Sequence, residues 1–152
     1  MEPRVRLVQR HSHIFLLVHV VWATRDRLPM LQPTMDGWLG DVLRRKAYEA
    51  GCRLVAFGSG NDHVHVLVRY PSTICIANAV HRLKGGSSYA WNAALPRRPV
   101  HSRLCWQAGY WAESVSPTEL LPITNYIETQ RQHHPGAQRP EPWETALSLH
   151  DR

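Results

Sequence analysis

A hairpin pattern in the middle of the chain commits it to an antiparallel sheet. Residues Leu54–Phe57 form a short apolar run, and His63–Tyr70 alternates along its length as a strand does. The turn sequence Gly58–Asp62, which reads GSGND, lies between the two runs. Two β-type runs that flank so short a turn pair with each other. The other elements must therefore be arranged around this hairpin.

Strand-type and helix-type patterns alternate along the chain. The predicted elements are a doubly buried strand at His13–Thr24, a helix at Thr34–Ala50, the hairpin, a helix at Pro71–Lys84, a bent strand or tight hairpin at Leu104–Val115, and a helix at Ser116–His133. The pair Gly85-Gly86 predicts a break in the second helix, with a resumption through Trp91 as the alternative. The order β-α-β-β-α-β predicts an α+β, ferredoxin-like sandwich with an antiparallel sheet and an extra C-terminal helix.

Length and composition predict one basic domain. The chain has 152 residues, a formal net charge of +6 and 43% hydrophobic residues, so residues 1–134 can form a single compact domain. Residues 135–152 read as a Pro-rich, loosely ordered tail. The cysteines include no C-x-x-C pair, and the longest apolar stretch is too short to cross a bilayer. We expect a cytoplasmic protein without a membrane partner.

Two histidines on the second hairpin strand are the first candidates for chemistry. His63 and His65 alternate with Val64 and Val66, so both imidazoles face the same side of the sheet. Neutral imidazoles at this spacing can share one cation. The alternative is a pair of surface histidines.

The last helix offers a third ligand. Tyr126 and Gln130 lie four residues apart and share one helix face. The alternative for this helix is a boundary aromatic and a solvated polar residue.

Several ordered motifs together resemble one known family. Residues 61–68 read NDHVHVLV, residues 83–88 LKGGSS, residues 109–115 GYWAESV, residues 125–130 NYIETQ, and the early run 19–27 reads HVVWATRDR. Over Gln9–His134 the chain resembles the single-tyrosine HUH transposases of small bacterial insertion sequences, which include the REP-associated tyrosine transposases.

The resemblance implies a DNA transposase and single-strand endonuclease. Tyr126 would be the nucleophile and would form a 5′-phosphotyrosine intermediate with single-stranded DNA that carries hairpin ends. His63, His65 and Gln130 would hold one divalent metal, Mg²⁺ or Mn²⁺. The family also implies a homodimer that acts at the bacterial or archaeal nucleoid. No nucleotide cofactor is expected, in agreement with the absence of a G-x-x-x-x-G-K-[ST] loop.

Basic residues are the candidates for DNA contacts, because the planar arginine fork suits phosphates and base edges. These candidates are Arg25, Arg27, Arg82, Lys84, Arg97, Arg98 and Arg103. Asp62 is either an acceptor that orients an imidazole or, as the favoured interpretation, a turn residue.

Three alternatives to an active transposase remain open. They are a non-catalytic nucleic-acid-binding module of ferredoxin-like fold, a metallohydrolase and an inactive transposase relative. A binding module of this fold would need aromatic side chains on the sheet to stack on bases, and the hairpin strand has histidine and leucine there instead. The second lacks a general base at a suitable spacing.

Overall fold

A four-stranded antiparallel sheet organises the computed structural model, which describes residues 12–94, 103–132 and 141–144. The strands are β1 (Leu16–Ala23), β2 (Arg53–Ser59), β3 (His63–Tyr70) and β4 (Trp111–Ser114). They lie in the order β2-β3-β1-β4, and each neighbouring pair is antiparallel. This is the predicted ferredoxin-like α+β sandwich, and the predicted hairpin is β2–β3.

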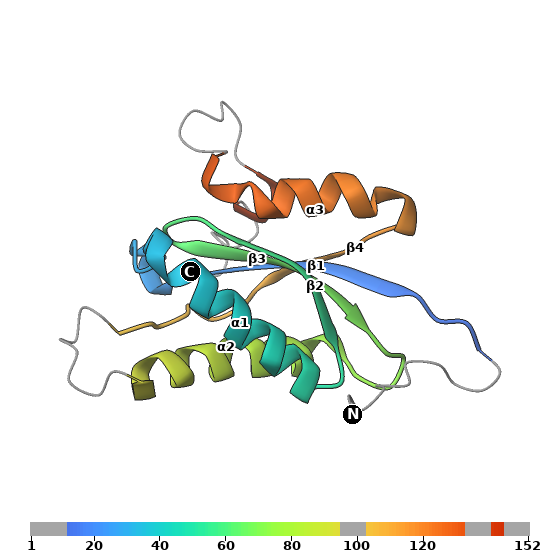
Figure 1. Cartoon of the computed structure of the whole chain (residues 1–152), viewed down its shortest axis with the longest axis horizontal. Coiled ribbons are helices and arrows are strands. Elements are labelled where there is room, and N and C mark those ends of the chain that lie inside the picture. Colours follow the sequence, from blue (N-terminus) through green and yellow to red (C-terminus); the bar gives the residue numbers. More distant parts are fainter. Residues whose placement is uncertain (1–11, 95–102, 133–140, 145–152) are drawn as a thin grey trace.

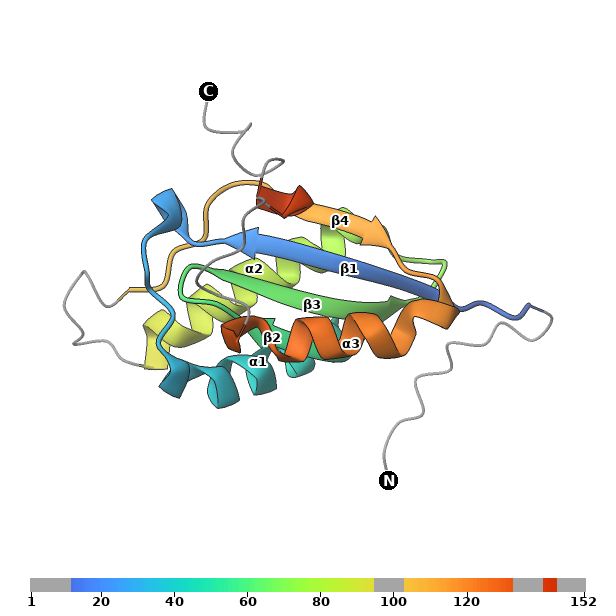
Figure 2. The same cartoon turned by 90° about the horizontal axis from the view of Figure 1, so that it is seen from above.

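Helices cover both faces of the sheet. Helices α1 (Asp36–Glu49) and α2 (Ile76–Ala94) pack side by side on one face, and α3 (Leu120–Glu128) crosses the other (Figures 1 and 2). Residues of β3 alternate between these faces. Val64, Val66 and Val68 belong to the large core under α1 and α2, whereas Leu67 packs with Ile127 of α3. The histidines of β3 therefore face α3.

Helix α2 is longer than predicted. It runs without interruption from Ile76 to Ala94, so the break expected at Gly85-Gly86 is wrong. Helices α1 and α2 approach closely at Gly86, where a Cβ would lie 2.8 Å from a side-chain carbon of Lys46. The glycine that looks like a helix breaker in the sequence thus allows two helices to pack.

The segment before β4 is less regular than predicted. Of Leu104–Val115 only Trp111–Ser114 is a strand, although Trp106 forms an isolated bridge with Thr24. Lys84 explains the difference, because its ammonium donates hydrogen bonds of 2.7 Å to the carbonyls of both Gln107 and Gly109. Those carbonyls are turned towards α2 and away from a β ladder.

The last helix is divided into three pieces. A 3-10 turn at Pro117–Glu119 leads into α3, and a second 3-10 turn, η5 (Gln130–Gln132), follows Thr129. Ser116 and Pro117 begin this unit as predicted. The predicted end at His133 lies outside the described residues. None of the helices in the described ranges is long and apolar enough to cross a membrane.

Candidate functional site

The two histidines of the hairpin lie inside the protein. His63 is 2% exposed and His65 is fully buried, between the sheet and α3. Their ring centroids lie 5.1 Å apart. The alternative of a surface histidine pair is therefore wrong, and the prediction that both imidazoles face one side of the sheet is correct.

Both ring nitrogens of His63 lie close to an oxygen of another side chain. Its Nδ1 lies 2.8 Å from Oδ1 of Asp62, and its Nε2 lies 3.4 Å from Oε1 of Gln130. Burial opposes ionisation of Asp62, but hydrogen bonds from His63 and Arg27 outweigh it and lower the pKa of this carboxyl to about 2. An ionised carboxylate can only accept a hydrogen bond. Nδ1 of His63 therefore carries a proton and Nε2 faces Gln130.

Gln130 presents its amide oxygen to His63 because its amide nitrogen is engaged elsewhere. The Nε2 group of Gln130 donates a 2.9 Å hydrogen bond to the Tyr126 carbonyl. A carbonyl accepts only, which fixes the orientation of this amide. When Nδ1 carries the ring proton, Nε2 of His63 and Oε1 of Gln130 are both acceptor atoms, so this position suits a cation.

His19 is a member of the cluster that the motif did not identify. Its Nε2 lies 2.9 Å from Nδ1 of His65, and the two rings stack at 5.1 Å. Burial lowers the pKa of His19 to about 4, so the ring is neutral near pH 7. The signal in the sequence was a histidine inside an otherwise apolar strand, where alternation places it on the same face as His65.

Tyr126 lies over the histidines from the last turn of α3. Its ring meets His65 and His19 edge to face, with centroids 5.5 and 6.1 Å apart. Burial is the main influence on Tyr126 and raises the pKa of the phenol. Tyr126 and His19 both line a cavity of about 360 Å³ that reaches Glu113 and Glu119.

A short C-terminal segment covers the histidines. Trp143 is 2% exposed, and its ring lies 4.5 Å from that of His63 and 5.2 Å from that of His65. The guanidinium of Arg27 lies 5.3 Å from the same indole. Trp143 belongs to the part of the chain expected to be loosely held, and sequence reasoning missed its contact with the site.

The predicted DNA-contact residues are spread around the molecule. Arg27 lies nearest to the site, where its Nε donates a 2.9 Å hydrogen bond to Asp62. Arg25, Arg82 and Arg103 are exposed. Lys84 is half-buried and bonded to the loop before β4. Arg97 and Arg98 lie outside the described residues.

The donor set at the site fits a divalent transition ion. Imidazole nitrogens and an amide oxygen are suitable ligands for such ions. Because His19 engages Nδ1 of His65, a cation bound by that ring would use Nε2. Asp62 and His19 would then be the groups that orient the two imidazoles. No group of three or more His, Cys, Asp or Glu side chains forms a metal-binding cluster within the described ranges; the third candidate ligand here is the amide of Gln130.

The chain is similar in sequence or in fold to known proteins. A family model described as "Transposase IS200 like" matches residues 12–130. A candidate transposase of Deinococcus radiodurans R1 is 31% identical, with a TM-score of 0.64, over 82% of this chain and 97% of that one. A REP-associated tyrosine transposase bound to a REP hairpin has the same fold at 13% identity, with a TM-score of 0.59, over 87% of this chain and 78% of that one. No sequence among the curated proteins matches. The family match covers more than half of the residues, and the chain therefore belongs to the IS200-like transposases.

Proposed function

We propose that this transposase cleaves and rejoins single-stranded DNA through a phosphotyrosine at Tyr126. The phenolic oxygen attacks a backbone phosphorus, the bond from phosphorus to the 3′ oxygen breaks, and the tyrosine keeps the 5′ phosphate. The released 3′ oxygen takes up a proton, and the reverse attack by a 3′-OH rejoins the strand. One phosphodiester replaces another, so no nucleotide hydrolysis is needed.

The observation that carries this proposal is the position of Tyr126 relative to His63, His65 and Gln130. All four side chains lie on the side of the sheet that α3 covers. The amide nitrogen of Gln130 donates a hydrogen bond to the backbone carbonyl of Tyr126. A phenol whose pKa is raised by burial is a weak nucleophile near pH 7. The reaction therefore needs positive charge beside the phosphate.

His63, His65 and Gln130 would hold a divalent metal, Mg²⁺ or Mn²⁺. A cation at this position supplies Lewis-acid stabilisation to a phosphate oxygen. Three neutral ligands would leave the charge of the ion undiminished. Imidazoles favour Mn²⁺ over Mg²⁺, so we expect Mn²⁺ to support activity at the lower concentration.

The DNA partner we propose is a single strand with hairpin ends. A relative of the same fold was solved with a REP hairpin, which supports this choice. The net charge of +6 favours a polyanion. We further propose a homodimer acting at the nucleoid in the cytoplasm; sedimentation velocity at several concentrations tests the dimer.

The central experiment is a search for a covalent adduct. Labelled hairpin oligonucleotides are incubated with the protein and Mn²⁺ or Mg²⁺, and SDS-resistant products are separated on a gel. Wild-type protein should form an adduct, and Tyr126→Phe should form none. Tyr89→Phe is a matched control, because Tyr89 is 77% exposed on α2 and should keep full activity.

The same experiment separates the proposal from its main rival. An adduct that persists in Tyr126→Phe would show that another residue is the nucleophile. Tight hairpin binding by wild-type protein without any adduct would favour a non-catalytic nucleic-acid-binding module. His63→Ala should lose the adduct and keep most of its DNA affinity, because arginines supply most of the attraction to the phosphates.

A further inference from the structure

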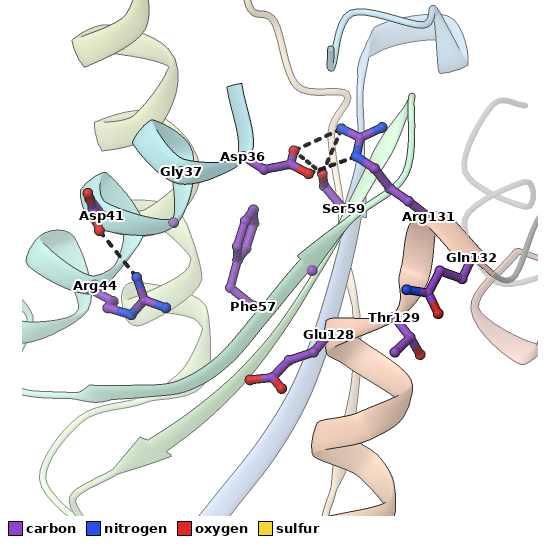
Figure 3. A pocket seen from close by; sticks show the side chains of 12 residues that line it. Asp36, Gly37, Asp41, Arg44, Phe57, Ser59, Glu128, Thr129, Arg131 and Gln132 are labelled. Carbon is purple, nitrogen blue, oxygen red and sulfur yellow. Dashed lines mark hydrogen bonds and ion pairs between the residues drawn. The ribbon is translucent and has the colours of Figure 1, made fainter. Parts of the chain in front are cut away.

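Arg131 ties the segment that carries Gln130 to the rest of the protein. Its guanidinium makes a forked contact with Asp36, in which Nε donates to Oδ2 at 2.7 Å and Nη2 donates to Oδ1 at 2.8 Å. The same group donates to Ser59 Oγ at 3.0 Å and to Asn61 Oδ1 at 2.9 Å. A bidentate arginine–carboxylate pair fixes orientation as well as distance. Figure 3 shows Arg131, Asp36 and Ser59 converging beside β2.

The side-chain partners of Arg131 come from three segments of the chain. Asp36 is the first residue of α1, Ser59 is the last residue of β2, and Asn61 lies in the turn that leads into His63. Ser59 also donates a 2.6 Å hydrogen bond to Asp36. The network therefore joins η5 to the turn that positions His63.

Arg131 and Gln130 are consecutive residues of η5 but point in different directions. Side chains that follow one another in a 3-10 helix diverge by about 120°. Gln130 is 2% exposed and faces His63, while Arg131 faces the start of α1. Movement of the Arg131 guanidinium would therefore shift the backbone that carries Gln130.

We propose that Arg131 is a positioning residue that sets the distance between Gln130 and His63. This inference rests on the proposed function, in which both side chains hold the divalent ion. The fork to Asp36 and the bond to Asn61 fix η5 against the hairpin turn. Metal affinity then depends on a guanidinium that does not itself face the ion.

A merely structural role for Arg131 predicts a different result. If the fork only stabilises the fold, its loss lowers the unfolding temperature and leaves the metal affinity of the folded protein unchanged. Arg131, Asp36 and Ser59 line a pocket of about 420 Å³, and this pocket offers a matched control. Arg44 also lines it, but pairs with Asp41 at 3.3 Å with both side chains exposed (Figure 3).

The test compares Arg131→Lys with Arg44→Lys. Lysine keeps the charge and loses the fork. We expect Arg131→Lys to weaken Mn²⁺ binding, measured by EPR titration of the folded protein, by about tenfold, as is common for residues that orient ligands. Arg44→Lys should bind Mn²⁺ as wild type does. In metal-free protein, the NMR signals of the Gln130 side-chain amide should shift in Arg131→Lys and stay in place in Arg44→Lys.

Two further variants keep the outcomes distinct. Asp36→Asn removes the carboxylate charge and leaves Arg131 in place, so it should weaken Mn²⁺ binding in the same direction. His63→Ala should abolish binding. Unchanged Mn²⁺ binding in His63→Ala would overturn the proposed metal site. Loss in His63→Ala with wild-type binding in both Arg131→Lys and Asp36→Asn would overturn only the positioning role.

Discussion

The carboxylate of Asp62 lies 2.8 Å from Nδ1 of His63, the next residue along the chain. The same carboxylate accepts a hydrogen bond from Arg27. Asp62 thus connects the basic end of β1 to the imidazole that faces Gln130. It is both a turn residue and an acceptor that orients the ring, two roles that the sequence presented as alternatives.

Asp62→Asn should make the protein less stable at pH 7 by about 1–2 kcal/mol, allowing for the partial exposure of the pair. The pKa of Asp62 is about 2 when folded, below its ordinary value of 3.8. A depressed pKa means that the stabilisation is present above pH 4 and is lost as the pH falls towards 2. Denaturant unfolding of both proteins from pH 7 to pH 2 should show converging stabilities. Asp41→Asn is the exposed control, with little change across the series.

His19→Gln should change the acid sensitivity of the fold. The pKa of His19 is about 4 when folded and 6.5 ordinarily, so between these values the unfolded chain binds a proton that the folded chain excludes. As the pH falls through that range, the wild type should lose about 1.4 kcal/mol of stability per pH unit from this residue. Glutamine cannot titrate. The free energy of unfolding of the variant should therefore rise relative to that of the wild type by the same amount for each unit by which the pH falls. Parallel pH profiles for the two proteins would contradict the buried neutral state of His19.

Gly58→Ala should displace α3 from the sheet. A Cβ at position 58 would overlap the backbone carbonyl of Ile127, and neither backbone can move without disturbing β2 or α3. We expect a loss of about 2–4 kcal/mol in the free energy of unfolding and weaker Mn²⁺ binding, because Gln130 follows Ile127 closely. Gly37→Ala is the control, since nothing lies within 4 Å of its added methyl group.

The continuity of α2 predicts that a glycine substitution in this helix stabilises the protein. Gly85 lies inside the helix, and a methyl group added there would meet open space. Gly85→Ala should therefore stabilise the protein by about 1 kcal/mol, as expected for an exposed helix interior. Thermal unfolding measures the change. A destabilised variant would mean that the helix is interrupted at Gly85, as the sequence alone predicted.

A mixing experiment tests whether the site is built from one chain. Tyr126 and the three candidate ligands meet within a single chain. Tyr126→Phe and His63→Ala proteins, mixed in equal amounts, should therefore form no DNA adduct. Recovery of adduct would show that the tyrosine of one subunit serves the histidines of another. A mixture of Tyr126→Phe with wild type is the positive control.

The main features of the fold follow from local patterns. The alternation in β3 predicted which valines enter the core and which histidines face α3, because side-chain direction in a strand depends only on parity. The four-residue spacing likewise predicted that Gln130 lies about one helical turn from Tyr126. These predictions needed no knowledge of distant contacts.

The features that were missed depend on residues far apart in the sequence. The break expected at Gly85-Gly86 is absent, and Gly86 instead leaves room for Lys46 of α1 to pack against α2. The bent strand or hairpin expected over Leu104–Val115 is reduced to β4, and Lys84 binds the carbonyls of Gln107 and Gly109 in the part that is not a strand. His19 joins the site through the β1–β3 register, and Trp143 through a contact with β3 across about 80 residues. Single-residue propensities carry no information on such pairings.

The sheet separates the large apolar core from the layer that holds the histidines. The large core of valines and leucines lies under α1 and α2, while the histidines, Tyr126 and Gln130 lie on the opposite face. Substitutions that repack the first layer need not alter the second. A library of variants restricted to the apolar residues under α1 and α2 should therefore yield thermostable forms that keep the arrangement of the candidate site, and it offers a practical route to a robust transposase.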